Sequence, residues 1–144
     1  MYKKILVPLD GSELAESVLP HVEALAKSEN AEIVLLRVAV TPDLSMFAHN
    51  PALATNIVKE LEDETDAYMK AEVIKLRDEG VKVSGITRGG AVPDTILAVA
   101  DETHADMIAM STHGRTGVKR WLMGSVADRV VHYSHIPVML IHPN

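Results

Sequence analysis

Five short apolar runs alternate with longer segments of helical periodicity, and this alternation limits the fold more than any other feature. Most of the runs are continuous rather than alternating, which is typical of strands buried on both faces of a parallel sheet. Four segments between or after them show apolar residues at helical spacing. The predicted strands are residues 5–9, 33–39, 81–87, 107–111 and 138–141, and the predicted helices are residues 12–27, 54–79, 92–104 and a last helix beginning at Ser125.

This β-α alternation predicts a parallel sheet with right-handed crossovers and helices on both faces. Ligands of such sheets bind beyond the carboxyl ends of the strands. The residues that follow each strand are therefore the first candidates for function. Residues 40–51 form the one long irregular stretch, and the sequence leaves open whether it is a lid over a ligand or a packed connection.

Composition narrows the functional classes. The chain has 144 residues, enough for one domain over residues 1–144, and its net charge of -6 argues against general binding to nucleic acid. It has no cysteine, which excludes disulfides and thiolate chemistry. We find no signal-peptide pattern and no apolar stretch of the roughly 20 residues needed to span a bilayer. We therefore expect a cytoplasmic protein without a membrane partner.

The segment STHGRTGVKRWLMGS, residues 111–125, holds three of the eight glycines and three basic residues. It joins the fourth predicted strand to the last predicted helix. Gly114 and Gly124 would let backbone N–H groups approach a bulky ligand, and Ser125 with Asp128 resembles a capping box. A helix N-terminus after a glycine-rich loop is suited to phosphate. An ordinary surface loop with turn glycines and a structural cap is the alternative.

The better-known phosphate motifs, GxxxxGK[ST] and GxGxxG after a strand, are absent. The segment instead resembles the G-x2-G-x9-G-[ST] loop of universal stress proteins of the ATP-binding branch. Gly114, nine intervening residues and Gly124-Ser125 match it, and Ser111 stands where the loop's first glycine would be. VPLDGSE near the start and SVADRVV…IPVMLI near the end also agree, so the resemblance covers the whole chain.

The resemblance implies an open five-stranded parallel sheet in the order 3-2-1-4-5, a Rossmann-like fold of the adenine nucleotide hydrolase-like kind. It also implies contacts to an adenine nucleotide: ATP, or AMP or ADP. Its Mg²⁺ would be held by phosphates and water. Ser111 would keep its backbone contact unless a positive φ were required there. The implied contacts are Pro8 and Asp10 to the adenosine part, the Val38 main chain to adenine, and Ser111, Gly114, Gly124, Ser125 and Val126 to ribose and phosphates.

From the residues alone, Asp10 could bind a ligand, cap the first helix, or do both. His113 and Arg115 are candidate neighbours of a phosphate. No activating partner stands beside His113 or Ser125, so we expect no catalytic residue. His132 and His135 lie three residues apart without an evident third ligand, so we expect no protein metal site.

The resemblance implies a stress-response or regulatory role in which the nucleotide acts as a switch. We expect a homodimer, because the last strand, residues 137–141, is apolar and would form an exposed sheet edge. Two alternatives stay open. One is a slow ATP hydrolase or phosphotransferase, and the other is a nucleotide-free dimeric interaction module.

Overall fold

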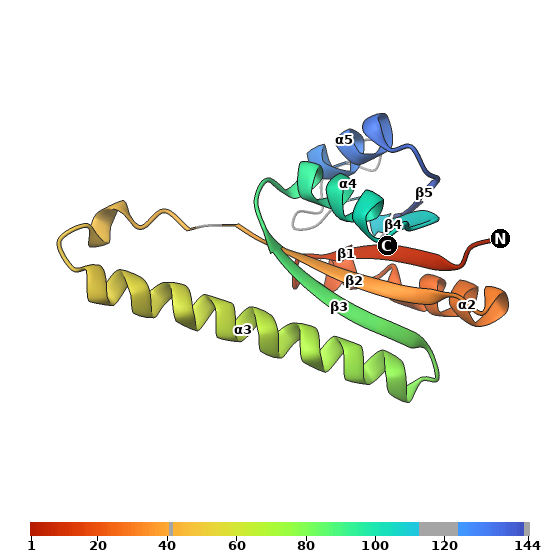
Figure 1. Ribbon diagram of the computed structural model, residues 1–144, viewed down its shortest axis with the longest axis horizontal. Coiled ribbons are helices and arrows are strands. Elements are labelled where there is room, and N and C mark those ends of the chain that lie inside the picture. Colours follow the sequence, from red (N-terminus) through yellow and green to blue (C-terminus); the bar gives the residue numbers. More distant parts are fainter. Residues whose placement is uncertain (41, 113–123, 143–144) are drawn as a thin grey trace.

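Five parallel strands form one sheet in the order β3-β2-β1-β4-β5, which confirms the predicted topology (Figure 1). The computed structural model describes residues 1–40, 42–112 and 124–142. Helices α4 and α5 lie against one face of the sheet, and α2 and α3 lie against the other. The elements are β1 (Lys4–Leu9), α1 (Glu13–Glu16), α2 (Leu19–Glu29), β2 (Glu32–Ala39), the 3-10 turn η1 (Ser45–Phe47), α3 (Pro51–Asp78), β3 (Lys82–Gly89), α4 (Val92–Glu102), β4 (Met107–Ser111), α5 (Ser125–Tyr133) and β5 (Val138–Ile141).

Strand β1 is the centre of the core. It pairs with β2 on one side and with β4 on the other, so it lies within the sheet between the helices of the two faces. Ile5 and Val7 pack on the side of α2 and α3, whereas Leu6 packs on the side of α4 and α5. All three are 0% exposed. Full burial of such side chains is worth about 1.5–3 kcal/mol each, which explains why this run is continuously apolar.

The first predicted helix is in fact two. Helix α1 ends at Glu16, and α2 begins at Leu19 with a proline in its first turn. Pro20 has no N–H to donate to the carbonyl four residues before it, and its ring would clash with that carbonyl in a continuous helix. The prediction of one continuous helix over residues 12–27 is therefore wrong at this break, although the residues on both sides are helical.

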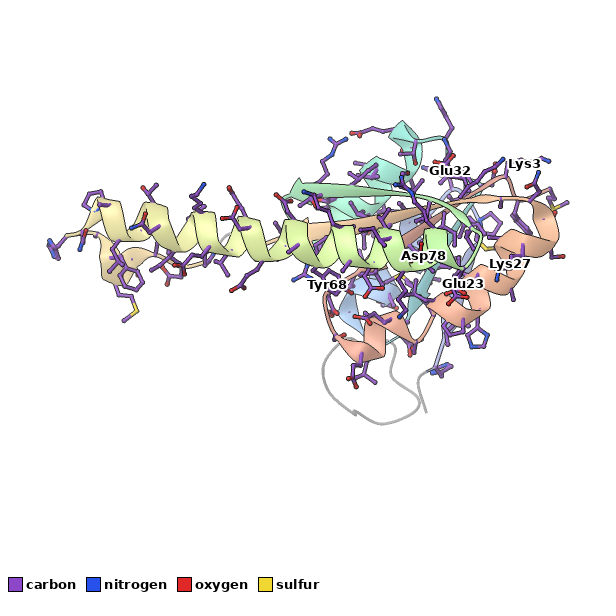
Figure 2. All side chains as sticks on the ribbon, turned by 90° about the horizontal axis from the view of Figure 1, so that it is seen from below. Lys3, Glu23, Lys27, Glu32, Tyr68 and Asp78 are labelled. Carbon is purple, nitrogen blue, oxygen red and sulfur yellow. The ribbon has the colours of Figure 1, made fainter. Side chains whose placement is uncertain are left out.

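Helix α3 begins earlier than predicted and extends far beyond the sheet (Figures 1 and 2). The side chain of Asn50 accepts a hydrogen bond from Leu53 N at 3.1 Å, and Pro51 occupies the first turn. Both are strong helix-start signals. Within α3, Met69 and Leu76 are buried, whereas the side chains that precede Tyr68 are exposed or half-buried.

Strands β1 and β4 are neighbours in the sheet, although β2 and β3 lie between them in the sequence. The chain moves from β1 to β3 over one face and returns to β4 over the other. Connections therefore diverge at the carboxyl ends of β1 and β4, which is where open α/β sheets bind ligands. None of the helices in the three described ranges is both long and apolar enough to span a bilayer.

The two ends of α3 allow a test of where this helix contributes to stability. Leu76 is 0% exposed and Leu53 is 41% exposed on the same helix. We expect Leu76→Ala to lower the free energy of unfolding by about 2–5 kcal/mol, because it leaves a cavity. Leu53→Ala, the matched control, should cost less than about 1 kcal/mol. Urea denaturation measures both, and equal losses would contradict the packing described here.

Candidate functional site

A cleft of about 1260 Å³ opens at the carboxyl ends of the strands. Its walls come from the ends of β1, β2, β3 and β4, from the start of α5, and from the part of α3 that overhangs the sheet. This is where divergent connections predict a site in an open parallel sheet. The cleft is larger than a typical small-molecule pocket of roughly 300–1,000 Å³.

The structure brings most of the predicted site residues together in this cleft. Of the eight expected nucleotide contacts, all but Gly114 are described, and each described one lines the cleft: Pro8, Asp10, Val38, Ser111, Gly124, Ser125 and Val126. Gly114 lies outside the described residues, as do the expected phosphate neighbours His113 and Arg115. Residues from four separate segments of the chain therefore share one surface.

Asp10 is oriented by the residues that follow it. Its Oδ1 accepts hydrogen bonds from the backbone N–H of Ser12 at 2.9 Å and from the Ser12 hydroxyl at 2.5 Å. The Ser12 hydroxyl in turn accepts from Ala15 N at 3.1 Å and is the N-cap of α1. Gly11 between them has a φ of +87°, where glycine is favoured. Asp10 thus supports the cap rather than forming it, and its carboxylate remains exposed at the cleft.

The main chain at Val38 is accessible for a simple topological reason. Strand β1 ends at Leu9, which is opposite Arg37 of β2. Val38 is paired with Arg88 of β3 on the other side, but β1 no longer covers it. One edge of the β2 backbone is therefore open to the cleft at this residue.

Ser111 ends β4 in ordinary extended backbone. Among the described residues other than glycine, only Asn30 and His104 have a positive φ. Serine therefore causes no backbone strain at this position. Its hydroxyl donates to the carbonyl oxygen of Leu14 at 2.7 Å, so its side chain is turned toward α1.

The start of α5 differs from the predicted capping box. Gly124 is the N-cap and Ser125 is the first helical residue, with no side-chain cap hydrogen bond. The N–H of Gly124 is also not available to a ligand, because it donates to the Thr112 carbonyl at 2.6 Å. The helix-terminal N–H groups of Ser125 and Val126 have no intrahelical acceptor, and both residues line the cleft.

Thr112 is a residue that the sequence reading missed. It directly follows β4, is 1% exposed, and lines the cleft. Its N–H donates to Ile141 O at 3.0 Å, its carbonyl accepts from Gly124, and its hydroxyl lies 3.3 Å from His142 Nδ1. Thr112 therefore joins three segments that are far apart in the sequence. A threonine that follows directly on an apolar predicted strand was the available signal.

A polar cluster beside the cleft joins α1, β2 and α3, and it was also missed. The Tyr68 hydroxyl donates to Glu16 Oε2 at 2.7 Å, and the Arg37 guanidinium lies 5.4 Å from the centre of the Tyr68 ring. Burial, followed by the hydrogen bond to Glu16, raises the pKa of Tyr68. Burial, followed by repulsion from Glu16, also raises the pKa of Glu72, although Lys75 opposes this. Figure 2 shows Tyr68 near the place where α3 leaves the rest of the molecule.

His132 and His135 occupy different surroundings at the end of α5. His132 lies in the last turn of α5 and His135 lies beyond its end. The His132 ring instead packs edge-on against Tyr133, with the ring centres 4.8 Å apart. In the described part of the chain, no group of three or more His, Asp or Glu side chains is arranged to hold a metal ion.

The sequence profile of the universal stress protein family matches residues 1–142. The chain belongs to this family. Universal stress protein MJ0577 of Methanocaldococcus jannaschii is 36% identical over 154 residues, covering 98% of this chain and 95% of the relative. Universal stress protein MJ0531 of the same organism is 35% identical over 143 residues, covering 98% of this chain and 82% of the relative.

Solved structures of the universal stress protein family have the same fold. The structure of MJ0577 superposes with a TM-score of 0.87 at 33% identity, covering 100% of this chain and 98% of the other. A universal stress protein family protein of Arabidopsis thaliana, solved with AMP bound, has a TM-score of 0.72 at 19% identity, covering 99% and 92%. A universal stress protein solved in complex with cAMP has a TM-score of 0.64 at 21% identity, covering 99% and 98%.

The raised pKa of Glu72 gives this universal stress protein a testable pH dependence. Glu72 Oε2 is buried and has no hydrogen-bond partner among the described residues. A raised folded-state pKa means that the fold binds this proton more tightly than the unfolded chain does. The charged carboxylate therefore weakens the fold at neutral pH, and this penalty disappears as the pH falls to about 4.

We expect Glu72→Gln to raise the free energy of unfolding at pH 7 and to leave it almost unchanged at about pH 4. Urea denaturation at both pH values measures the difference. Glu60→Gln, at an exposed position of the same helix, is the matched control and should change little at either pH. A loss of stability in Glu72→Gln at pH 7 would show that its charge is compensated.

Proposed function

We propose that this universal stress protein binds an adenine nucleotide in the cleft at the carboxyl ends of its strands. ATP is the expected ligand, and AMP and ADP are the alternatives. One observation supports this most strongly. Seven residues that the family resemblance assigns to nucleotide contact, drawn from four separate segments, line one cleft. A lone glycine-rich loop would not predict that convergence.

The geometry suits each part of such a ligand. The open backbone edge at Val38 offers main-chain hydrogen bonds to adenine, and the oriented carboxylate of Asp10 can accept them from the adenosine part. The N–H groups at the start of α5 and the positive end of its dipole favour phosphate. The extended backbone of Ser111 remains compatible with a contact to ribose or phosphate.

Mg²⁺ would depend on the ligand rather than on the protein. The described residues supply no cluster of three carboxylates or histidines for it. Magnesium commonly keeps several waters and binds substrate phosphates. We therefore propose that phosphates and water hold the ion, so Mg²⁺ alone should bind weakly.

The proposed role is regulatory, with the nucleotide acting as a switch in a cytoplasmic stress response. Membership of the universal stress protein family supports this role. The relatives solved with AMP and with cAMP show that proteins of this fold accommodate adenine nucleotides. Ligand-dependent regulation requires only that the bound and free states differ in their interactions.

Thermal melting of nucleotide-stripped protein with ATP, ADP, AMP or GTP, each with and without Mg²⁺, tests the proposal. A ligand at 100 times its dissociation constant adds about 2.7 kcal/mol to the stability of the native state. For a chain of this size, we expect the Tm to rise by several degrees with adenine nucleotides only.

Gly124→Val is the informative variant in the same melt. Gly124 has a φ of -59° and a ψ of 152°, which valine can adopt, and it lines the cleft. The variant should fold but lose the nucleotide-dependent rise. A wild-type protein that shows no rise with any nucleotide would instead favour an interaction module. Turnover of ATP lost in Ser125→Ala would favour a hydrolase.

We also propose a homodimer formed through β5. This strand lies at the edge of the sheet, and its four side chains are half-buried. Pro137 O and Ile141 O accept hydrogen bonds from Ile108 and Thr112 on the β4 side. Backbone groups alternate along a strand, so those of Val138 and Leu140 point away from β4. They are available to pair with the same strand of a second copy.

Leu140→Pro removes an outward N–H while keeping the β4–β5 hydrogen bonds, so we expect it to produce monomers. Leu140→Ala removes the same side chain but keeps the N–H, and it should remain dimeric. Sedimentation equilibrium measures the mass of both. A dimer that survives Leu140→Pro in folded protein would place the interface elsewhere.

A further inference from the structure

Two serine hydroxyls connect β4 to the break between α1 and α2. Ser111 Oγ donates to Leu14 O at 2.7 Å and approaches Ala15 O at 3.3 Å. Ser17 Oγ donates to Leu14 O at 2.6 Å. The two hydroxyl oxygens are 3.0 Å apart. Ser17 and Ser111 are separated by 94 residues, so this cluster is a tertiary contact.

The cluster exists because α1 is short. The helix ends at Glu16, and Pro20 prevents it from continuing regularly into α2. Its last carbonyl groups therefore lack intrahelical donors and accept hydrogen bonds from other groups. The Leu14 carbonyl oxygen accepts from the backbone N–H of Ser17 at 3.3 Å as well as from both hydroxyls, because an oxygen with two lone pairs can take more than one donor. Glycine at position 111 could not make this contact.

The cluster lies between two walls of the proposed nucleotide site. The loop from Asp10 to Ser12 leads directly into α1, and the Ser12 cap and the Asp10 carboxylate are hydrogen-bonded to each other. On the other side, Ser111 leads into Thr112, whose carbonyl holds Gly124 at the start of α5. The hydroxyl pair thus bridges the Asp10 wall and the α5 wall.

We infer that Ser17 and Ser111 act together as positioning residues that hold these two walls at a fixed separation for a nucleotide that contacts both. The inference rests on the proposed function and deepens it. Ser111, at the position of the loop's first glycine, contributes through its side chain as well as through its backbone. A preorganised site binds more tightly because less ordering is required on binding.

The test compares wild type, Ser17→Ala, Ser111→Ala and the double variant. Calorimetric titration with ATP gives the Kd of each protein, and urea denaturation gives its stability. Loss of one neutral hydrogen bond should weaken binding about three- to tenfold. The double variant should bind about as weakly as either single variant, because the two hydroxyls act as one unit.

Thr103→Ala is the matched control. The Thr103 hydroxyl donates to Val99 O at 2.7 Å at the end of α4, so it makes the same kind of helix-end hydrogen bond. Thr103 does not line the cleft. This variant should lose stability but keep the wild-type Kd, which separates a general loss of stability from a loss of positioning.

Three results with the variants would overturn the inference alone. Folded Ser111→Ala that keeps the wild-type Kd would show that the hydroxyl has no role in binding. Losses that add in the double variant would show that the two serines act separately. A Ser111→Gly variant that binds more tightly than wild type would show that the serine obstructs the site. If wild-type protein binds no nucleotide, the proposed function fails and the inference fails with it.

Discussion

Pairing of β1 on both of its edges is the constraint on which the rest of the structure depends. Its partners are β2 and β4, and all three strands run in the same direction. Their carboxyl ends therefore meet at one side of the sheet, and both faces require a cover of helices. The helices that follow β1 and β4 lie on opposite faces of the sheet, which opens the cleft between the ends of these two strands.

Polar contacts connect the strand and helix ends that form the walls of this cleft. Asp10 orients Ser12, Ser111 binds the end of α1, and Thr112 binds the N-cap of α5. Each contact satisfies a backbone or hydroxyl group at the end of a regular element, where hydrogen bonds within that element are unavailable. The hydrogen bonds that satisfy the ends of these strands and helices therefore also link the segments that line the cleft.

The strands and their order were predictable, because burial on both faces requires continuous apolar runs that are visible in the sequence. Pro20 signals the break between α1 and α2, and Asn50-Pro51 signals the early start of α3. The prediction followed the helical spacing of apolar residues and gave these local signals too little weight. The Ser125 cap was misassigned because the helix boundary depends on the Thr112–Gly124 hydrogen bond, a contact between segments. The cluster of Glu16, Arg37, Tyr68 and Glu72 consists of tertiary contacts, which the spacing of residues in the sequence does not predict.

The charges around the cleft favour one orientation of the proposed ligand. Glu62 and Asp66 of the overhanging part of α3 line the cleft and are exposed. They repel phosphates, whereas the N-terminus of α5 attracts them. Arg37 and Arg88 also line the cleft, but the Arg37 guanidinium lies over the Tyr68 ring at 5.4 Å and that of Arg88 is paired with Glu102 at 3.2 Å. The phosphates should therefore lie toward α5 and the base toward β2 and α3, which is the orientation that the open backbone at Val38 requires.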